Sequence, residues 1–242
     1  MRPYQRLPES LLKNLVINKF FSIILFIRMS INIILCMYSI IFYTNHRVND
    51  SIFSTCLSRV STISRLDNAE LIVVSWKPVA VENNIILRNL KSCHMSLYTQ
   101  ILAGLQRCKY NKIFLVEHDV LYPRDHFKIE ATPGKYTYNS NVYHLTKEGF
   151  FKAASCNFLS TLITDKETLL KGINEKIDEI KTIGRVSWAE FGNPDIFVTV
   201  HGENPVVDIR HGNNFTAHRS SLTYLDSIDY WNGKESYSKF WN

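Results

Sequence analysis

Several patterns that would define a class of protein are missing from this sequence. Its five cysteines are odd in number and include no C-x-x-C pair, which supports neither a zinc ribbon nor a disulfide framework and favours buried free thiols. The 28 lysines and arginines form no basic block, so no nucleic-acid partner is expected. There is no H-E-x-x-H or H-x-H motif, and the histidines therefore do not indicate a metallohydrolase.

What is present is the composition of a globular protein with a basic surplus. The 242 residues are 45% hydrophobic, 21% charged and 12% aromatic, which suits one α/β domain, or one domain with an appendage. The net charge of +6 favours anionic partners such as phosphates, nucleotides or a membrane surface.

The N-terminal part contains a long hydrophobic run, Phe20 to Tyr43, with Arg28 as its only charge. The run is long enough for a transmembrane helix, and the basic segment before it, residues 1–19, favours a signal anchor and a single-pass, type II membrane protein. If residues 20–43 pack on the domain instead, the protein is soluble and cytoplasmic. Residues 44–68, rich in Ser, Thr and Asn, are predicted to be a linker or stem, and residues 69–242 the main domain.

The start of the main domain is typical of a parallel sheet. Glu70 to Trp76 and Ile113 to Glu117 are apolar, β-branched runs that predict two buried strands. Between them, Ser96 to Cys108 has apolar side chains at helical spacing. Because a strand, a crossover helix and a second strand form the unit of parallel sheets, we predict an α/β fold with helices on the faces of the sheet.

The second half of the domain predicts further elements. The aromatic runs around "NSN" in residues 134–146 indicate a hairpin, and residues 156–164 a strand. Asp165 is expected to cap a helix over residues 166–183, and residues 195–200 and 205–212 are late extended segments.

The stretch "KIFLVEHDVLYP" places Glu117, His118 and Asp119 directly after the second strand. Ligands of open α/β sheets bind beyond the carboxyl ends of the strands, where one or two carboxylates and substrate phosphates commonly hold Mg²⁺ or Mn²⁺. In a strand-like backbone residues 117 and 119 share one side and residue 118 faces the other. We therefore expect the two carboxylates, not the imidazole, to face a metal.

This stretch resembles the D-x-D element of GT-A glycosyltransferases, with Glu117 in place of the first acid and Asp119 matching the last. The resemblance implies a Rossmann-related, mostly parallel sheet flanked by helices, with residues 69–242 as the catalytic domain. It implies a nucleotide-sugar donor and a Mn²⁺ or Mg²⁺ ion held by Asp119 and Glu117. Many members of the family supply a late histidine as a third ligand, a role implied for His211 in "VDIRHGNNFT".

Other residues are candidates for the remaining parts of such a site. Arg210 and Lys91 could hold phosphate oxygens, and Trp76 could pack against the base or ribose. Glu190 and Asp195 are candidates for the general base, and Glu190 is favoured because it follows the aromatic Trp188. The acceptor, whether glycan, lipid or protein, is left open.

Two alternatives remain at this point. A nucleotidyltransferase has a similar sheet and an acidic metal site, but "SWKPVAVENN" after the first strand lacks the expected Gly-rich phosphate loop. The other alternative is a non-catalytic, membrane-tethered binding protein that kept the fold.

Overall fold

A computed structural model of the chain describes residues 37–153, 157–193, 195–212, 214 and 223–241. The chain divides into residues Met1–Met37 and a compact unit, Tyr38–Asn242. All the elements described below belong to the second unit.

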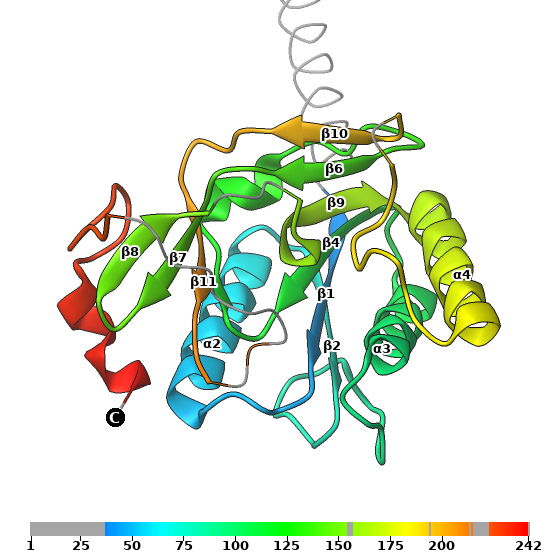
Figure 1. The fold of residues 1–242 in the computed structure, drawn as a ribbon, viewed down its shortest axis with the longest axis horizontal. Helices are drawn as coiled ribbons and strands as arrows, with labels where there is room; N and C mark the ends of the chain where they lie inside the picture. Colours follow the sequence, from blue (N-terminus) through cyan, green and yellow to red (C-terminus); the bar gives the residue numbers. More distant parts are fainter. Residues whose placement is uncertain (1–36, 154–156, 194, 213, 215–222, 242) are drawn as a thin grey trace, which may run out of the picture. The chain divides into compact units, whose positions relative to one another are not determined.

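A seven-stranded sheet forms the centre of this unit, in the order β10-β6-β9-β4-β1-β2-β3 (Figure 1). Neighbouring strands are parallel except β9, which is antiparallel to both β4 and β6. The strands are β1 (Tyr38–Thr44), β2 (Glu70–Ser75), β3 (Asn84–Ile86), β4 (Lys112–Glu117), β6 (Tyr136–Asn139), β9 (Leu162–Asp165) and β10 (Phe197–Val200). The predicted α/β class with a mostly parallel sheet flanked by helices is confirmed.

A smaller sheet of four strands has the order β5-β11-β7-β8. Its strands are β5 (Val120–Leu121), β7 (Val142–Thr146), β8 (Gly149–Lys152) and β11 (Val206–Ile209). The short 3-10 helices are η1 (Arg124–Lys128), η2 (Leu159–Thr161) and η3 (Lys234–Phe240). β5 follows β4 by two residues and pairs with β11, so the small sheet brings the late strand beside the end of β4.

Helices cover both faces of the large sheet, and the alternation of side chains along β1 and β4 explains why. Ile41 and Leu115 face the layer of α3 (His94–Arg107) and α4 (Lys166–Ile183). Ile40 and Phe114 face the layer of α2 (Asp50–Leu66). Because both faces of these strands are buried, their sequences are continuous apolar runs, as expected for central parallel strands.

Most of the helices and strands predicted for this unit are present in the structure. The two predicted early strands are β2 and β4, and the helix predicted over residues 96–108 is α3. Asp165 caps α4, with its side chain accepting a hydrogen bond from the backbone N–H of Thr168.

The predicted boundary of the domain is wrong, because the main unit begins at Tyr38 instead of residue 69. The end of the predicted transmembrane run, Tyr38–Thr44, is the buried central strand β1, which pairs with β2 and β4. A strand buried on both faces is as apolar as a membrane helix, so hydrophobicity alone does not separate them. The earlier part of the run, residues 20–36, and the basic segment 1–19 lie outside the described residues. Among the helices that are described, none is long and apolar enough to cross a membrane.

The predicted stem is also wrong over most of its length, because residues 50–66 form α2. Asn49 caps this helix by accepting a hydrogen bond from the N–H of Ile52. The buried side chains Ile52, Cys56, Val60 and Ile63 are spaced four, four and three residues apart, which is one face of a helix. Most of the Ser and Thr residues of the predicted stem lie between these positions.

The predicted hairpin around "NSN" is a crossing between the two sheets. β6 pairs with β9 and β10 in the large sheet, and β7 pairs with β8 and β11 in the small one. Asn139 accepts hydrogen bonds from the N–H groups of Asn141 and Gly202, and Asn141 donates to the carbonyl of Gly202. These bonds hold the bend that the sequence alone did not distinguish from a turn.

Candidate functional site

A cavity of about 430 Å³ lies at the carboxyl ends of β1, β2 and β4. Its lining includes Thr44 at the end of β1, Trp76 directly after β2 and Glu117 at the end of β4. This is the edge at which open α/β sheets bind ligands. A cavity therefore lies at the predicted position of the site.

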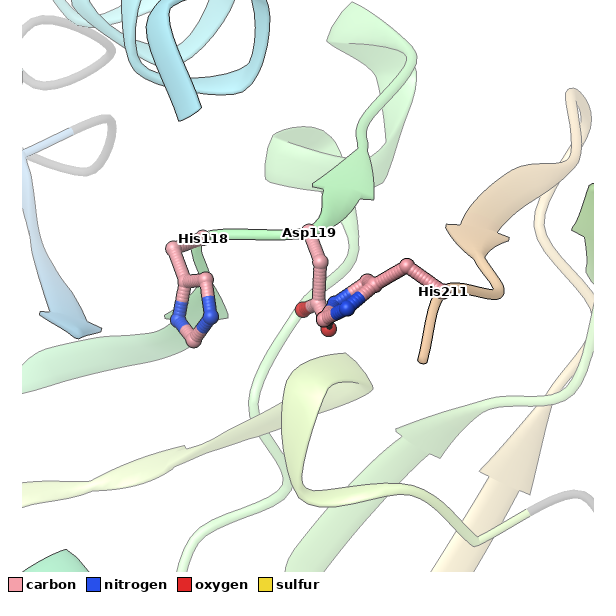
Figure 2. A group of neighbouring side chains, drawn as sticks. All are labelled: His118, Asp119 and His211. Atoms are coloured by element: carbon pink, nitrogen blue, oxygen red, sulfur yellow. Dashed lines mark hydrogen bonds and ion pairs between the residues drawn. The ribbon is translucent and has the colours of Figure 1, made fainter. Parts of the chain in front are cut away.

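Three potential metal ligands converge beside this cavity (Figure 2). His118 and Asp119 project from the turn that joins β4 to β5, and His211 reaches Asp119 from the segment after β11. One ligand atom of each residue lies within 4.8 Å of the other two, and Asp119 Oδ2 is 3.1 Å from His211 Nε2. The convergence of Asp119 and His211 agrees with the sequence prediction, although 92 residues separate them.

Two polar atoms of this cluster have no hydrogen-bond partner in the part of the chain that the structure describes and are suited to bind a cation. Asp119 Oδ1 and His118 Nδ1 are buried and have no hydrogen-bond partner among the described residues. A buried carboxylate oxygen without a partner is unfavourable unless another group satisfies it. A divalent cation would do so, and two imidazoles with one carboxylate form a common donor set for transition metals.

The charge of Asp119 is maintained by its neighbours. Burial raises the pKa of the Asp119 carboxyl, but His118, together with the hydrogen bond and charge of His211, outweighs burial, so the pKa lies below its usual value. Asp119 is therefore ionised at neutral pH and available as a ligand.

Asn214 holds the two distant ligands in place. Its Nδ2 donates to Asp119 Oδ2 at 3.0 Å, and its Oδ1 accepts a hydrogen bond from the backbone N–H of His211. One side chain thus orients both the carboxylate and the residue that carries the imidazole. Residues that hydrogen-bond to metal ligands in this way commonly have a large effect on metal affinity.

Glu117 does not join this cluster, which corrects the expectation that residues 117 and 119 would face the metal together and His118 would point away. The carboxylate of Glu117 instead accepts a hydrogen bond from Tyr43 at 2.5 Å, from the neighbouring strand β1. Burial, followed by the charge of Asp119, raises the pKa of Glu117 to about 8. The alternation of a strand ends with β4 at Glu117, so the turn sets the directions of the next two side chains.

The structure brings some of the other predicted residues to the cavity and leaves others away from it. Trp76, Glu190 and Arg210 line the cavity, and Arg210 is held by an ion pair with Asp208 at 2.9 Å. Lys91 and Asp195 are exposed and are not among the described residues that line it. Neither of these two residues is therefore placed to meet a ligand bound there.

Tyr43, His118 and Asn214 are residues of the site that the sequence pattern does not predict. Tyr43 lies inside the hydrophobic run that also suits a membrane helix, and strand alternation places His118 on the side opposite to the one it occupies. Asn214 lies three residues after His211, a spacing at which an Asn side chain can bond the local backbone. That spacing was the available signal for Asn214.

Comparisons with known proteins find no matching protein-family model and no related curated protein. Among solved structures, the chain is similar to a glycosyltransferase involved in the glycosylation of the major capsid of PBCV-1. That similarity has a TM-score of 0.48 at 7% identity, over 68% of this chain and 82% of that chain.

The chain is also similar to a mutant Drosophila β1,4-galactosyltransferase 7 in complex with manganese, UDP-Gal and xylobiose. That match has a TM-score of 0.43 at 11% identity and covers 82% of this chain and 83% of that chain. The catalytic domain of the Drosophila enzyme with xylobiose has a TM-score of 0.41 at 11% identity, with the same coverage of both chains.

Proposed function

We propose that this chain is a metal-dependent glycosyltransferase that moves a sugar from a nucleotide-sugar donor to a hydroxyl group of an acceptor. The observation that carries the proposal is the cluster of His118, Asp119 and His211 beside a cavity at the carboxyl ends of parallel strands, in which Asp119 Oδ1 and His118 Nδ1 have no hydrogen-bond partner among the described residues. The D-x-D-like sequence at the same place supports it.

In this proposal His118, Asp119 and His211 hold the divalent cation. A cation there would neutralise negative charge on the departing nucleoside diphosphate. Two imidazoles favour Mn²⁺ over Mg²⁺, because Mg²⁺ prefers oxygen ligands and retains its waters. Asn214 would keep the carboxylate and His211 in register while the donor binds and leaves.

Arg210 is proposed to contact the phosphate oxygens. Its side chain is 9% exposed and lines the cavity, and its ion pair with Asp208 fixes the direction of the guanidinium. Arginine binds phosphate through a planar fork of N–H donors, and these hydrogen bonds are strongest when the guanidinium is held in the right direction. Trp76 would form part of the wall for the nucleoside.

Glu190 is proposed as the general base of an inverting transfer. Glu190 lines the cavity, and burial raises its pKa above the usual value, which improves a carboxylate as a proton acceptor. The acceptor O–H would give its proton to Glu190 as the oxygen bonds to the anomeric carbon. In the same step the bond from that carbon to the diphosphate oxygen would break, and its electron pair would leave on the nucleoside diphosphate. The acceptor in this scheme is a glycan, a lipid or a protein.

Calorimetry on the full chain tests the proposal. UDP and GDP are titrated with and without Mn²⁺, and a panel of nucleotide sugars is then screened for metal-dependent hydrolysis. We expect Mn²⁺-dependent binding of one nucleotide and turnover of a donor that carries it, both lost in Asp119→Ala and His211→Ala. Asp178→Ala, a change of an exposed acid on α4, serves as the control. Absence of nucleotide binding in Mn²⁺, or binding that survives both substitutions, would refute the proposal.

A further inference from the structure

The segment that joins α4 to β10 (yellow to orange in Figure 1) carries Glu190 and contains neither helix nor strand between residues 186 and 191. Irregular segments of this kind usually run over the surface with their backbone groups bound to water. Here side chains from three elements bind the backbone instead.

Two residues of α4 hold the first half of the segment. Glu179 Oε1 accepts a hydrogen bond from the N–H of Ser187 at 2.7 Å, and Lys176 Nζ donates to the carbonyl of Trp188 at 2.6 Å. Lys176 and Glu179 also form an ion pair at 3.5 Å, and their side chains are only 16% and 24% exposed. Each residue therefore binds both its partner and the segment.

Other charged pairs on α4 lack these features. Lys171 and Glu175 are 4.0 Å apart with side chains 77% and 62% exposed, and the side chains of Lys181 and Asp178 are 65% and 72% exposed. Pairs this exposed contribute little to stability. The pair of Lys176 and Glu179 differs from them because both of its members also bind the segment.

Two tyrosines hold the second half of the segment. Tyr98 of α3 donates to the carbonyl of Ala189 at 2.7 Å. The Tyr138 hydroxyl of β6 donates to the carbonyl of Phe191 and accepts from its N–H. The ring of Phe191 is buried. The backbone on each side of Glu190 is thus fixed by named side chains.

Trp188 and Glu190 are therefore both carried on a fixed backbone. Trp188 is 63% exposed, and Glu190 lines the cavity. We propose that Lys176 and Glu179 are positioning residues of the transferase: they fix the segment so that the Glu190 carboxylate meets the acceptor hydroxyl. The inference rests on the proposed function. A misplacement of about 1 Å at such a group can lower the rate roughly 100-fold.

Hydrogen exchange followed by mass spectrometry tests the contact itself on the full chain. We expect the double variant Lys176→Ala/Glu179→Ala to exchange about tenfold faster over residues 186–191 and not elsewhere. The matched control is Lys171→Ala/Glu175→Ala, which removes an exposed pair from the same helix. The conservative variants Lys176→Arg and Glu179→Gln keep a donor and an acceptor and should retain slow exchange. Unchanged exchange in the double variant would refute the inference.

Kinetics of metal-dependent nucleotide-sugar hydrolysis test the positioning role, with water in place of the acceptor. The double variant should lower kcat about 10- to 100-fold and leave the donor KM and the affinity for UDP or GDP with Mn²⁺ unchanged. The two conservative variants should restore most of kcat. A loosened segment with normal kcat overturns the inference alone. A wild-type chain that neither binds nucleotide nor turns over any donor overturns the proposed function and the positioning role together.

Discussion

Tyr43 of β1 lies opposite Glu117 of β4 in the register of the parallel sheet and donates a hydrogen bond from its phenolic O–H to the Glu117 carboxyl group. The bond sits at the end of the strand from which His118 and Asp119 emerge. It links the end of the first strand of the unit to the turn that carries two of the proposed ligands. Glu117 thus lines the cavity and also helps to hold the turn that carries the proposed ligands.

Removing this bond should destabilise the fold. In Tyr43→Phe the buried carboxyl group of Glu117 loses its hydroxyl donor, and the free energy of unfolding should fall by about 1–3 kcal/mol. Urea denaturation followed by circular dichroism measures the change. Tyr143→Phe, the same change on the smaller sheet, is the control, and equal stabilities of the two variants would contradict the role given to the bond.

Substitutions at the neighbouring residues Glu117 and His118 should differ in their effect on metal affinity. His118→Ala removes a member of the cluster and should weaken Mn²⁺ binding by at least about tenfold, whereas Glu117→Gln keeps the cluster and should change it by less than about threefold. Electron paramagnetic resonance of free Mn²⁺ measures both. The opposite order would restore the pairing of Glu117 with Asp119 predicted from strand alternation.

Asn214 should matter for the metal although it is not one of the clustered ligands. Asn214→Ala removes the donor to Asp119 and the acceptor for the His211 N–H, and we expect about 10- to 100-fold weaker Mn²⁺ binding. Asn214→Asp keeps an acceptor but adds a negative charge beside Asp119. Asn174→Ala, an exposed change on α4, is the control. Wild-type affinity in Asn214→Ala would show that the ligands hold their own positions.

The buried His126 should make the fold sensitive to acid. Burial lowers the pKa of its imidazole to about 3, whereas the unfolded chain titrates near its usual value of about 6.5. Between these values the unfolded state binds a proton that the native state does not. This residue therefore lowers stability as pH falls through the window, by up to about 1.4 kcal/mol per pH unit.

The slope of unfolding free energy against pH, measured from about pH 7 to 4, tests this expectation. His126→Gln should show a shallower slope than the wild type, whatever its absolute stability. His201→Gln, which replaces an exposed histidine, is the control. Parallel slopes in all three proteins would show that His126 does not titrate differently in the two states.

Local signals predicted much of the fold because they depend on neighbours in the chain. The apolar runs of β2 and β4, the periodicity of α3 and the cap at Asp165 follow from side-chain spacing and hydrogen bonding within a few residues. The predictions failed where two structures share one local pattern. The run ending at Tyr43 suits a membrane helix and a central strand equally well, and only pairing with β2 and β4 decides between them.

The site shows the same division between local pattern and tertiary contact. The sequence by itself determined that acids follow β4 at the carboxyl edge of a parallel sheet, because strand direction and the end of an apolar run are local properties. Tertiary structure decided which side chains meet there. β5 pairs with β11 and brings His211 to Asp119, and the turn after β4 directs His118 to the cluster while Tyr43 holds Glu117. These contacts depend on packing between distant segments, which no spacing within the chain encodes.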